Sequence, residues 1–168
     1  IVPRREGHQY SANFDSGEFY FVTNKDAENF KVMRAPASAP GEKNWTDFIP
    51  FNPAVKIDGI NFCKDYAVVS EVENGLEYIR VMDRKTRRAS SRIETPESVY
   101  TISVSTNPEY DTPSVRYNYS SMITPNSTYE FDFKTRKSNL IKQQEITSGY
   151  DKRKYETKRV CGADREGV

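Results

Sequence analysis

Hydrophobic and polar residues alternate with a period of two along most of this chain. In the stretch 116–121, for example, Tyr117 and Tyr119 are separated by single polar residues, and this alternation is typical of a β-strand whose two faces differ. The pattern predicts strands at His8–Phe14, Phe19–Thr23, Lys31–Arg34, Trp45–Ile49, Lys56–Phe62, Tyr66–Glu73, Leu76–Met82, Arg88–Ile93, Val99–Ser105, Val115–Ser121, Thr128–Phe133 and Asn139–Glu145. No helix is predicted, because the longest helical candidate, Ile141–Thr147, is short and poorly capped.

The segments between these strands are rich in Asp, Asn, Gly and Pro. The pair Asn74-Gly75 is the strongest turn signal, because both residue types tolerate the positive φ of a tight hairpin. The Pro-Ala stretch Ala35–Pro40 can be interpreted as an interdomain linker or as a long hairpin loop. We favour the loop, because the strand pattern resumes at Trp45.

The spacing of the strands predicts the fold class. Corresponding strands recur about every 40 to 50 residues, which is the spacing of four-stranded propeller blades. We therefore expect an all-β chain with about three four-stranded antiparallel blades of an incomplete β-propeller. Such an arc has two open sheet edges and uncovered apolar faces, so we expect self-association through its first or last blade.

Composition narrows the range of partners. The 25 Lys and Arg residues nearly balance the 24 Asp and Glu residues along the whole chain, which argues against a nucleic-acid or membrane surface. Hydrophobic residues make up 36% and aromatic residues 12%, a mixture that suits many short, half-exposed strands. The sequence has no apolar run of about 20 residues, so no membrane span is predicted. Its first residues, IVPRREGH, contain no apolar leader region.

Cysteine and histidine are too scarce to predict a metal site. Cys63 and Cys161 could form one disulfide, but we favour a reduced pair and a cytoplasmic location. One histidine and two cysteines lack the spacing of a zinc site. No cofactor or metal is therefore expected.

The stretch 116–132, RYNYSSMITPNSTYEFD, is the most informative segment. It predicts a hairpin with a stiff corner, in which Pro125 fixes one backbone angle. Its YSSxxTP core resembles a signature of the oligopeptidase B group, within the prolyl oligopeptidase family of serine peptidases. The residues that carry the resemblance here are Tyr119, Ser120, Ser121, Thr124, Pro125, Tyr129 and Asp132, and we interpret them as structural. Ordered matches elsewhere, such as PRREGHQY, EFYFVTN and GYD, extend it over nearly the whole chain.

The resemblance implies a domain organisation. Residues 1–146 would be part of a seven-bladed propeller, residues 147–154 a hinge, and residues 155–168 the first strand of an α/β-hydrolase domain. Gly149, Tyr150 and Asp151 are the hinge candidates. The family hydrolyses short peptides after Lys or Arg, and its propeller admits only narrow or flexible substrates. The implied partners are therefore the catalytic domain and short basic peptides.

The catalytic residues of the family are missing from these 168 residues. Its Ser-Asp-His triad requires a G-x-S-x-G nucleophile elbow, and the sequence contains neither this motif nor any histidine except His8. We expect no catalytic residue here and no activity of the chain alone. Two alternatives remain: a stand-alone β-propeller or β-sandwich interaction module, and a small hydrolase that uses His8.

Three other groups of residues could contact ligands, but each has a simpler interpretation. The acidic pairs Glu71 with Glu73 and Glu109 with Asp111 could bind a guanidinium group, although solvated carboxylates beside turns are the default. The basic run 84–88 is expected to be a solvated turn. Nine aromatic residues could stack on bases, but we expect them to pack between blades; they are Phe14, Phe19, Tyr20, Phe21, Tyr117, Tyr119, Tyr129, Phe131 and Phe133.

Overall fold

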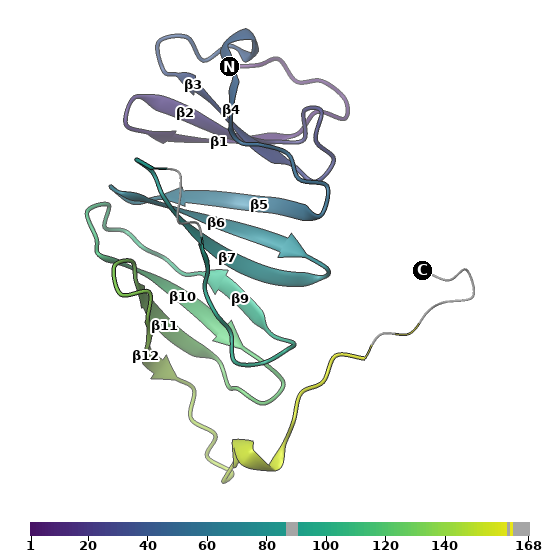
Figure 1. The fold of residues 1–168 in the computed structure, drawn as a ribbon, viewed down its shortest axis with the longest axis vertical. Coiled ribbons are helices and arrows are strands. Elements are labelled where there is room, and N and C mark those ends of the chain that lie inside the picture. Colours follow the sequence, from purple (N-terminus) through teal and green to yellow (C-terminus); the bar gives the residue numbers. More distant parts are fainter. Residues whose placement is uncertain (87–90, 161, 163–168) are drawn as a thin grey trace.

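The computed structural model describes residues 1–86, 91–160 and 162, and within them the chain forms three four-stranded antiparallel sheets (Figure 1). The first sheet contains β1 (Tyr10–Asp15), β2 (Glu18–Thr23), β3 (Lys31–Pro36) and β4 (Thr46–Ile49). The second contains β5 (Val55–Phe62), β6 (Tyr66–Glu73), β7 (Leu76–Asp83) and β8 (Ser91–Arg92). The third contains β9 (Thr101–Val104), β10 (Ser114–Ser120), β11 (Ser127–Asp132) and β12 (Ser138–Gln143). The short 3-10 turns η1 (Glu42–Asn44) and η2 (Lys152–Lys154) complete the described elements.

This arrangement confirms the all-β prediction. Each sheet is a meander in which every strand pairs with the next along the chain. The eighth predicted strand, Arg88–Ile93, is observed only at Ser91–Arg92, and its residues 88–90 lie outside the described part. Among the described residues, no helix is long and apolar enough to cross a bilayer.

The Ala35–Pro40 stretch contains the end of β3 and the start of the hairpin connection to β4. Arg34 of β3 lies opposite Thr46 of β4 in the same sheet, so the segment between them cannot separate two domains. Within it, the Trp45 indole donates a hydrogen bond to the Pro40 carbonyl oxygen over 3.0 Å. The loop interpretation is therefore confirmed.

The three sheets stack face to face, and their side chains form the core between them. In β6, Ala67, Val68 and Val69 are all fully buried. Ala67 and Val69 face the first sheet, whereas Val68 packs toward the third. A strand that is covered on both faces loses its polar alternation, which explains this continuous apolar run.

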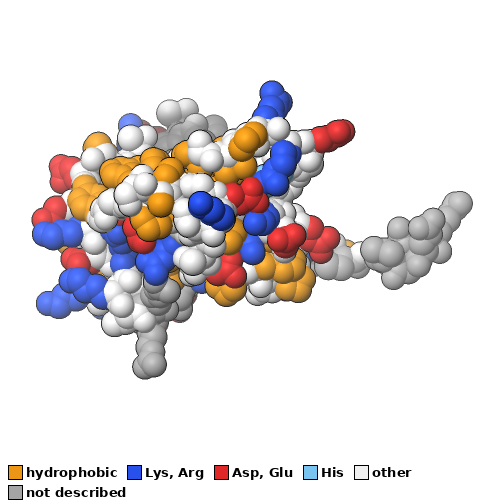
Figure 2. Space-filling view, turned by 90° about the horizontal axis from the view of Figure 1, so that it is seen from above, with side chains coloured by type: hydrophobic (Ala, Val, Ile, Leu, Met, Phe, Trp, Pro, Cys, Tyr) orange, Lys and Arg blue, Asp and Glu red, His pale blue; other side chains and the backbone are white. Residues whose placement is uncertain are grey.

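The two outermost sheet faces differ in chemistry. The outer face of the first sheet carries aromatic residues that are mostly covered. Phe21 is fully buried and stacks on Trp45 with ring centroids 4.0 Å apart, and Val2 and Tyr10 pack against them, whereas Phe14 is 62% exposed. Figure 2 looks down on this end of the molecule and shows hydrophobic side chains gathered there. The outer face of the third sheet is lined instead by short polar side chains, among them Ser103 and Asn118. Exposed apolar side chains are thus present at both ends of the described arc: Phe14 on the first sheet, and Leu140 and Ile141 on β12 of the third.

Most of the aromatic residues named above pack as expected. Tyr20 packs between the first and second sheets, and Tyr117, Tyr119, Phe131 and Phe133 between the second and third. Phe14, Phe19 and Phe21 are the exceptions, because they lie on the outer face of the first sheet. Phe21 is buried there, Phe19 packs against it, and Phe14 is 62% exposed.

Candidate functional site

The predicted hairpin is formed by β10 and β11, with a turn that its own side chains close. The Ser121 hydroxyl accepts hydrogen bonds from the backbone N–H groups of Ile123 (3.1 Å) and Thr124 (2.9 Å). Beyond Pro125, whose ring fixes φ, the Ser127 hydroxyl donates to the Pro125 carbonyl oxygen over 2.6 Å. These local bonds explain why Ser, Thr and Pro occupy the turn.

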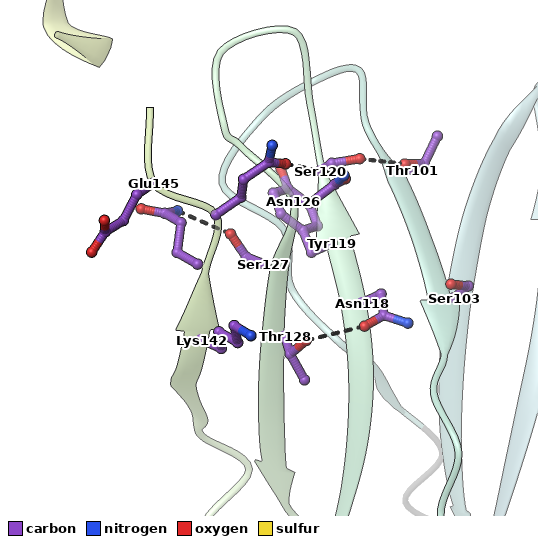
Figure 3. A pocket seen from close by; sticks show the side chains of 12 residues that line it. Thr101, Ser103, Asn118, Tyr119, Ser120, Asn126, Ser127, Thr128, Lys142 and Glu145 are labelled. Carbon is purple, nitrogen blue, oxygen red and sulfur yellow. Dashed lines mark hydrogen bonds between the residues drawn. The ribbon is translucent and has the colours of Figure 1, made fainter. Parts of the chain in front are cut away.

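Other signature residues pack within the third sheet. Tyr129 stacks on Tyr117 at 5.4 Å, and the hydroxyl groups of Ser120 and Thr101 lie 2.8 Å apart (Figure 3). The Asp132 carboxylate accepts the backbone N–H groups of Thr135 (2.6 Å) and Lys134 (3.0 Å), which lower its pKa.

A buried carboxylate, Glu97, joins this hairpin to the predicted hinge. Its side chain is 6% exposed and lies in the connection between β8 and β9. It accepts hydrogen bonds from the hydroxyl of Tyr119, from the hydroxyl of Thr124 (2.6 Å) and from the Lys152 ammonium. We call these four residues the Glu97 cluster. Glu97 was not predicted from the sequence, because no local pattern distinguishes it from an exposed glutamate.

The electrostatics of the cluster favour an ionised Glu97. Burial raises the pKa of a carboxyl group, but the hydrogen bonds from Lys152, Thr124 and Tyr119 outweigh burial, so the pKa of Glu97 is lowered. Burial, together with the neighbouring carboxylate, raises the pKa of Tyr119. The cluster therefore holds a carboxylate and an ammonium beside a neutral phenol.

The hinge candidates lie against the third sheet. Gly149 has a φ of +81°, a conformation that favours glycine. The Tyr150 hydroxyl donates to the Ile123 carbonyl oxygen over 2.7 Å, and Asp151 caps η2 by accepting the Arg153 N–H over 3.1 Å. The hinge role itself stays a prediction.

The segment after η2 has no strand in residues 155–160, although a strand was predicted for residues 155–168. Instead it turns back past the sheets: the Ser98 hydroxyl donates to the Thr157 carbonyl oxygen over 3.3 Å, and Arg159 donates to the carbonyl oxygen of Asn74. A strand needs a partner for its backbone groups, and none pairs with residues 155–160 here. Residues 161 and 163–168, including Cys161, lie outside the described part.

The acidic pairs have different environments. The expectation of a solvated carboxylate is wrong for Glu71, because its side chain is only 3% exposed. It accepts the Arg80 Nε–H over 2.6 Å and also pairs with Arg92, beside a pocket formed with the β4–β5 connection. Asp111, by contrast, is 73% exposed and pairs with Lys64 at 2.6 Å.

The basic run is also not simply solvated. The Arg84 side chain is 13% exposed. Its guanidinium pairs with Asp15 of the first sheet, and it donates to the Cys63 carbonyl oxygen (2.9 Å) and the Tyr110 hydroxyl (3.0 Å). Tyr110 lies in the β9–β10 connection, so Arg84 links all three sheets. Arg87 and Arg88 lie outside the described residues.

His8 has no serine partner among its hydrogen bonds in the described chain. Its Nε2 lies 3.1 Å from the Thr23 hydroxyl and its Nδ1 lies 3.2 Å from the Arg5 guanidinium. No group of three His, Cys, Asp or Glu side chains in the described residues is placed to hold a metal ion. Cys63 is free and buried, and burial raises the pKa of its thiol.

Taken together, these features define a β-propeller domain: four-stranded meanders stacked face to face, each entered from the last strand of the one before. A family model described as the N-terminal β-propeller domain of prolyl oligopeptidase matches residues 1–144. The chain therefore belongs to the prolyl oligopeptidase family of serine peptidases.

Individual relatives agree with this assignment. The chain is 36% identical to dipeptidyl aminopeptidase BI from Pseudoxanthomonas mexicana over 99% of its own length, and 24% identical to protease 2 from Moraxella lacunata over all of it. It is also similar to the structure of oligopeptidase B from Trypanosoma brucei with covalently bound antipain, in a closed form, with a TM-score of 0.89 and 26% identity over the whole chain. It spans 23%, 24% and 25% of these three relatives, respectively.

Proposed function

We propose that this chain is the gating part of a serine oligopeptidase that cleaves short peptides after Lys or Arg. The observation that carries the proposal is the match to an oligopeptidase B structure along all 168 residues, together with the signature hairpin at residues 116–132. The catalytic groups would belong to an α/β-hydrolase domain outside these residues, and that domain would be the principal partner. We also propose a cytoplasmic location, which the free thiol of Cys63 supports.

The role of the propeller would be steric. A propeller that covers an active site excludes bulky folded proteins and bulk water, and it admits short or flexible peptides. Opening about residues 147–154 would then admit the substrate and release the product. The positive φ of Gly149, next to the bonded Tyr150 and Asp151, supports a pivot at this position.

One observation favours a second candidate function. The relative at 36% identity is named a dipeptidyl aminopeptidase, so the parent protein could remove dipeptides from a free N-terminus. The two candidates share the propeller and differ in which end of the peptide they recognise. A third possibility, a stand-alone interaction module, requires no catalytic domain.

The first test is the coding sequence after Val168. A continuation with a G-x-S-x-G motif, followed by Asp and then His, supports a peptidase. An immediate stop codon would instead favour the interaction module. The chain of 168 residues, assayed alone with an Arg-containing fluorogenic peptide, should show no cleavage.

The second test separates the two peptidase activities. A protein that includes the catalytic domain is assayed with Arg peptides whose N-terminal amine is blocked, and with the same peptides whose N-terminal amine is free. Cleavage of the blocked peptide supports the oligopeptidase, whereas cleavage that requires the free amine supports the dipeptidyl aminopeptidase.

The hinge gives a further prediction for the same protein. Gly149→Pro should reduce peptide turnover, because proline fixes φ near −65° whereas Gly149 has a φ of +81°. Gly41→Ala, at a glycine with a φ of −65° far from the hinge, is the control. Unchanged steady-state kinetics of Gly149→Pro would contradict the hinge role.

A further inference from the structure

The Glu97 cluster brings together three parts of the chain that are distant in sequence. Glu97 lies in the connection that enters the third sheet, Tyr119 and Thr124 belong to the signature hairpin, and Lys152 belongs to η2 after the last strand. Glu97 and Lys152 are 55 residues apart. The Lys152 ammonium also donates to the Thr124 hydroxyl over 2.7 Å, so Lys152 contacts both Glu97 and the hairpin directly.

A buried carboxylate needs compensation for its lost hydration. Charge-assisted hydrogen bonds are the strong ones, and a carboxylate can accept several of them. Two of the three donors to Glu97 are neutral hydroxyl groups, and Lys152 supplies the positive charge. The hydroxyl groups orient the carboxylate, while the ammonium balances its charge.

The exit segment has a second attachment to the same hairpin. The Tyr150 hydroxyl donates to the Ile123 carbonyl oxygen, and the Tyr150 ring stacks on Tyr155 at 5.5 Å. Two backbone bonds close η2 itself, from Lys154 N–H to the Asp151 oxygen and from Tyr155 N–H to the Lys152 oxygen, both over 3.1 Å. The path of residues 150–155 is therefore defined at both ends, and it begins just after Gly149.

We propose that Glu97 is a positioning residue for the exit segment: oriented by Tyr119 and Thr124, it holds Lys152 and sets the direction in which the chain leaves the propeller. This assigns two signature residues a role beyond packing. If the proposed function is right, the Glu97 cluster also restrains movement between the propeller and the catalytic domain.

The experiment measures hydrogen exchange at the Lys154 and Tyr155 amides in the chain of 168 residues. Glu97→Gln and Lys152→Met should each speed exchange by about tenfold, because loss of the ion pair frees η2 to open locally. The β10 and β11 amides should not change. Lys152→Arg should retain protection, and Glu94→Gln, at an exposed carboxylate three residues earlier, is the control.

A second readout separates direct pairing from general loosening. The carboxyl pKa of Glu97, followed by NMR, should rise in Lys152→Met, because the ion pair lowers it. Lys152 is 47% exposed, so its replacement should leave the fold intact even if Glu97→Gln does not fold. Equal exchange in Glu94→Gln and both cluster variants, or an unchanged Glu97 pKa in Lys152→Met, would overturn the proposal.

The consequence for turnover has its own test. In a protein that includes the catalytic domain, Glu97→Gln should change kcat more for long peptides than for short ones, because only long peptides need wide opening. An unchanged ratio overturns the restraint on domain movement. If the longer protein cleaves no peptide, the proposed function fails, while the exchange result still decides whether Glu97 positions the exit segment.

Discussion

Glu71 and Glu73 show how two similar residues acquire different roles. They lie two residues apart on β6, yet the Glu71 side chain is 3% exposed and that of Glu73 is 28% exposed. Both contact Arg92, whose guanidinium lies 3.9 Å from the centre of the Tyr78 ring. Burial makes Glu71 dependent on its two arginine partners, whereas water can solvate Glu73.

At this scale we predict that Glu71→Gln lowers the free energy of unfolding by about 2 kcal/mol. Breaking a fully buried ion pair costs about 3–5 kcal/mol, and the cost here is smaller because Arg80 and Arg92 are partly exposed. Glu73→Gln, the matched control, should cost less than about 1 kcal/mol. Urea denaturation of the two variants measures the difference, and equal losses would contradict the assigned roles.

The elements themselves depend on turns that only particular residues can make. Asn74 has a φ of +50° and Gly75 a φ of +72° in the β6–β7 turn, as a two-residue hairpin requires. This turn sets the register of the longest pair in the second sheet, in which Glu73 lies opposite Leu76 and Tyr66 lies opposite Asp83. A one-residue slip would exchange the two faces of a strand, so that residues now packed against the first sheet would face the third.

For this element we predict that Gly75→Ala destabilises the chain by about 1–2 kcal/mol, because a positive φ is strained for residues with a Cβ. The nearest side-chain atom to such a Cβ lies 3.4 Å away, on Arg159, so backbone strain rather than a clash is the cause. Gly41→Ala, with open space around its Cβ and a φ of −65°, should change stability by less than about 0.5 kcal/mol. Thermal unfolding of both variants tests this, and a neutral Gly75→Ala would refute it.

The whole molecule is an arc with two unlike ends. Its first sheet exposes Phe14 (62%) beside a covered aromatic layer. The outer face of its third sheet exposes hydroxyl and amide groups that bond to each other, such as Asn118 with Thr128 at 3.2 Å (Figure 3). Water solvates the polar face without cost, whereas contiguous apolar surface favours association. Leu140 and Ile141 on β12 are also exposed, so association is expected through Phe14 on the first sheet, through the β12 edge of the third, or through both.

We predict concentration-dependent self-association of the chain that Phe14→Lys weakens. A charge on the aromatic face must be desolvated when two such faces pack, which disfavours the contact. Ser103→Lys places the same charge on the polar face and should have no effect. Light scattering over a range of concentrations measures both variants. A wild-type monomer at high concentration, or equal effects of the two substitutions, would contradict the prediction.

Much of this fold could be predicted from local features of the sequence. Period-two alternation, the Asn74-Gly75 turn and the recurrence of about 40 to 50 residues determined the strands, their hairpins and their grouping into blades, because each depends on backbone preferences of neighbouring residues. The family resemblance came from such local segments as well. Only the tertiary structure decided which charged residues are buried: Asp15 and Arg84 are 69 residues apart, and Glu97 and Lys152 are 55 apart. It also decided that residues 155–160 have no strand partner, and that the outer face of the third sheet is lined by polar side chains. Burial and pairing depend on what the folded chain places beside a residue, and no local pattern records those neighbours.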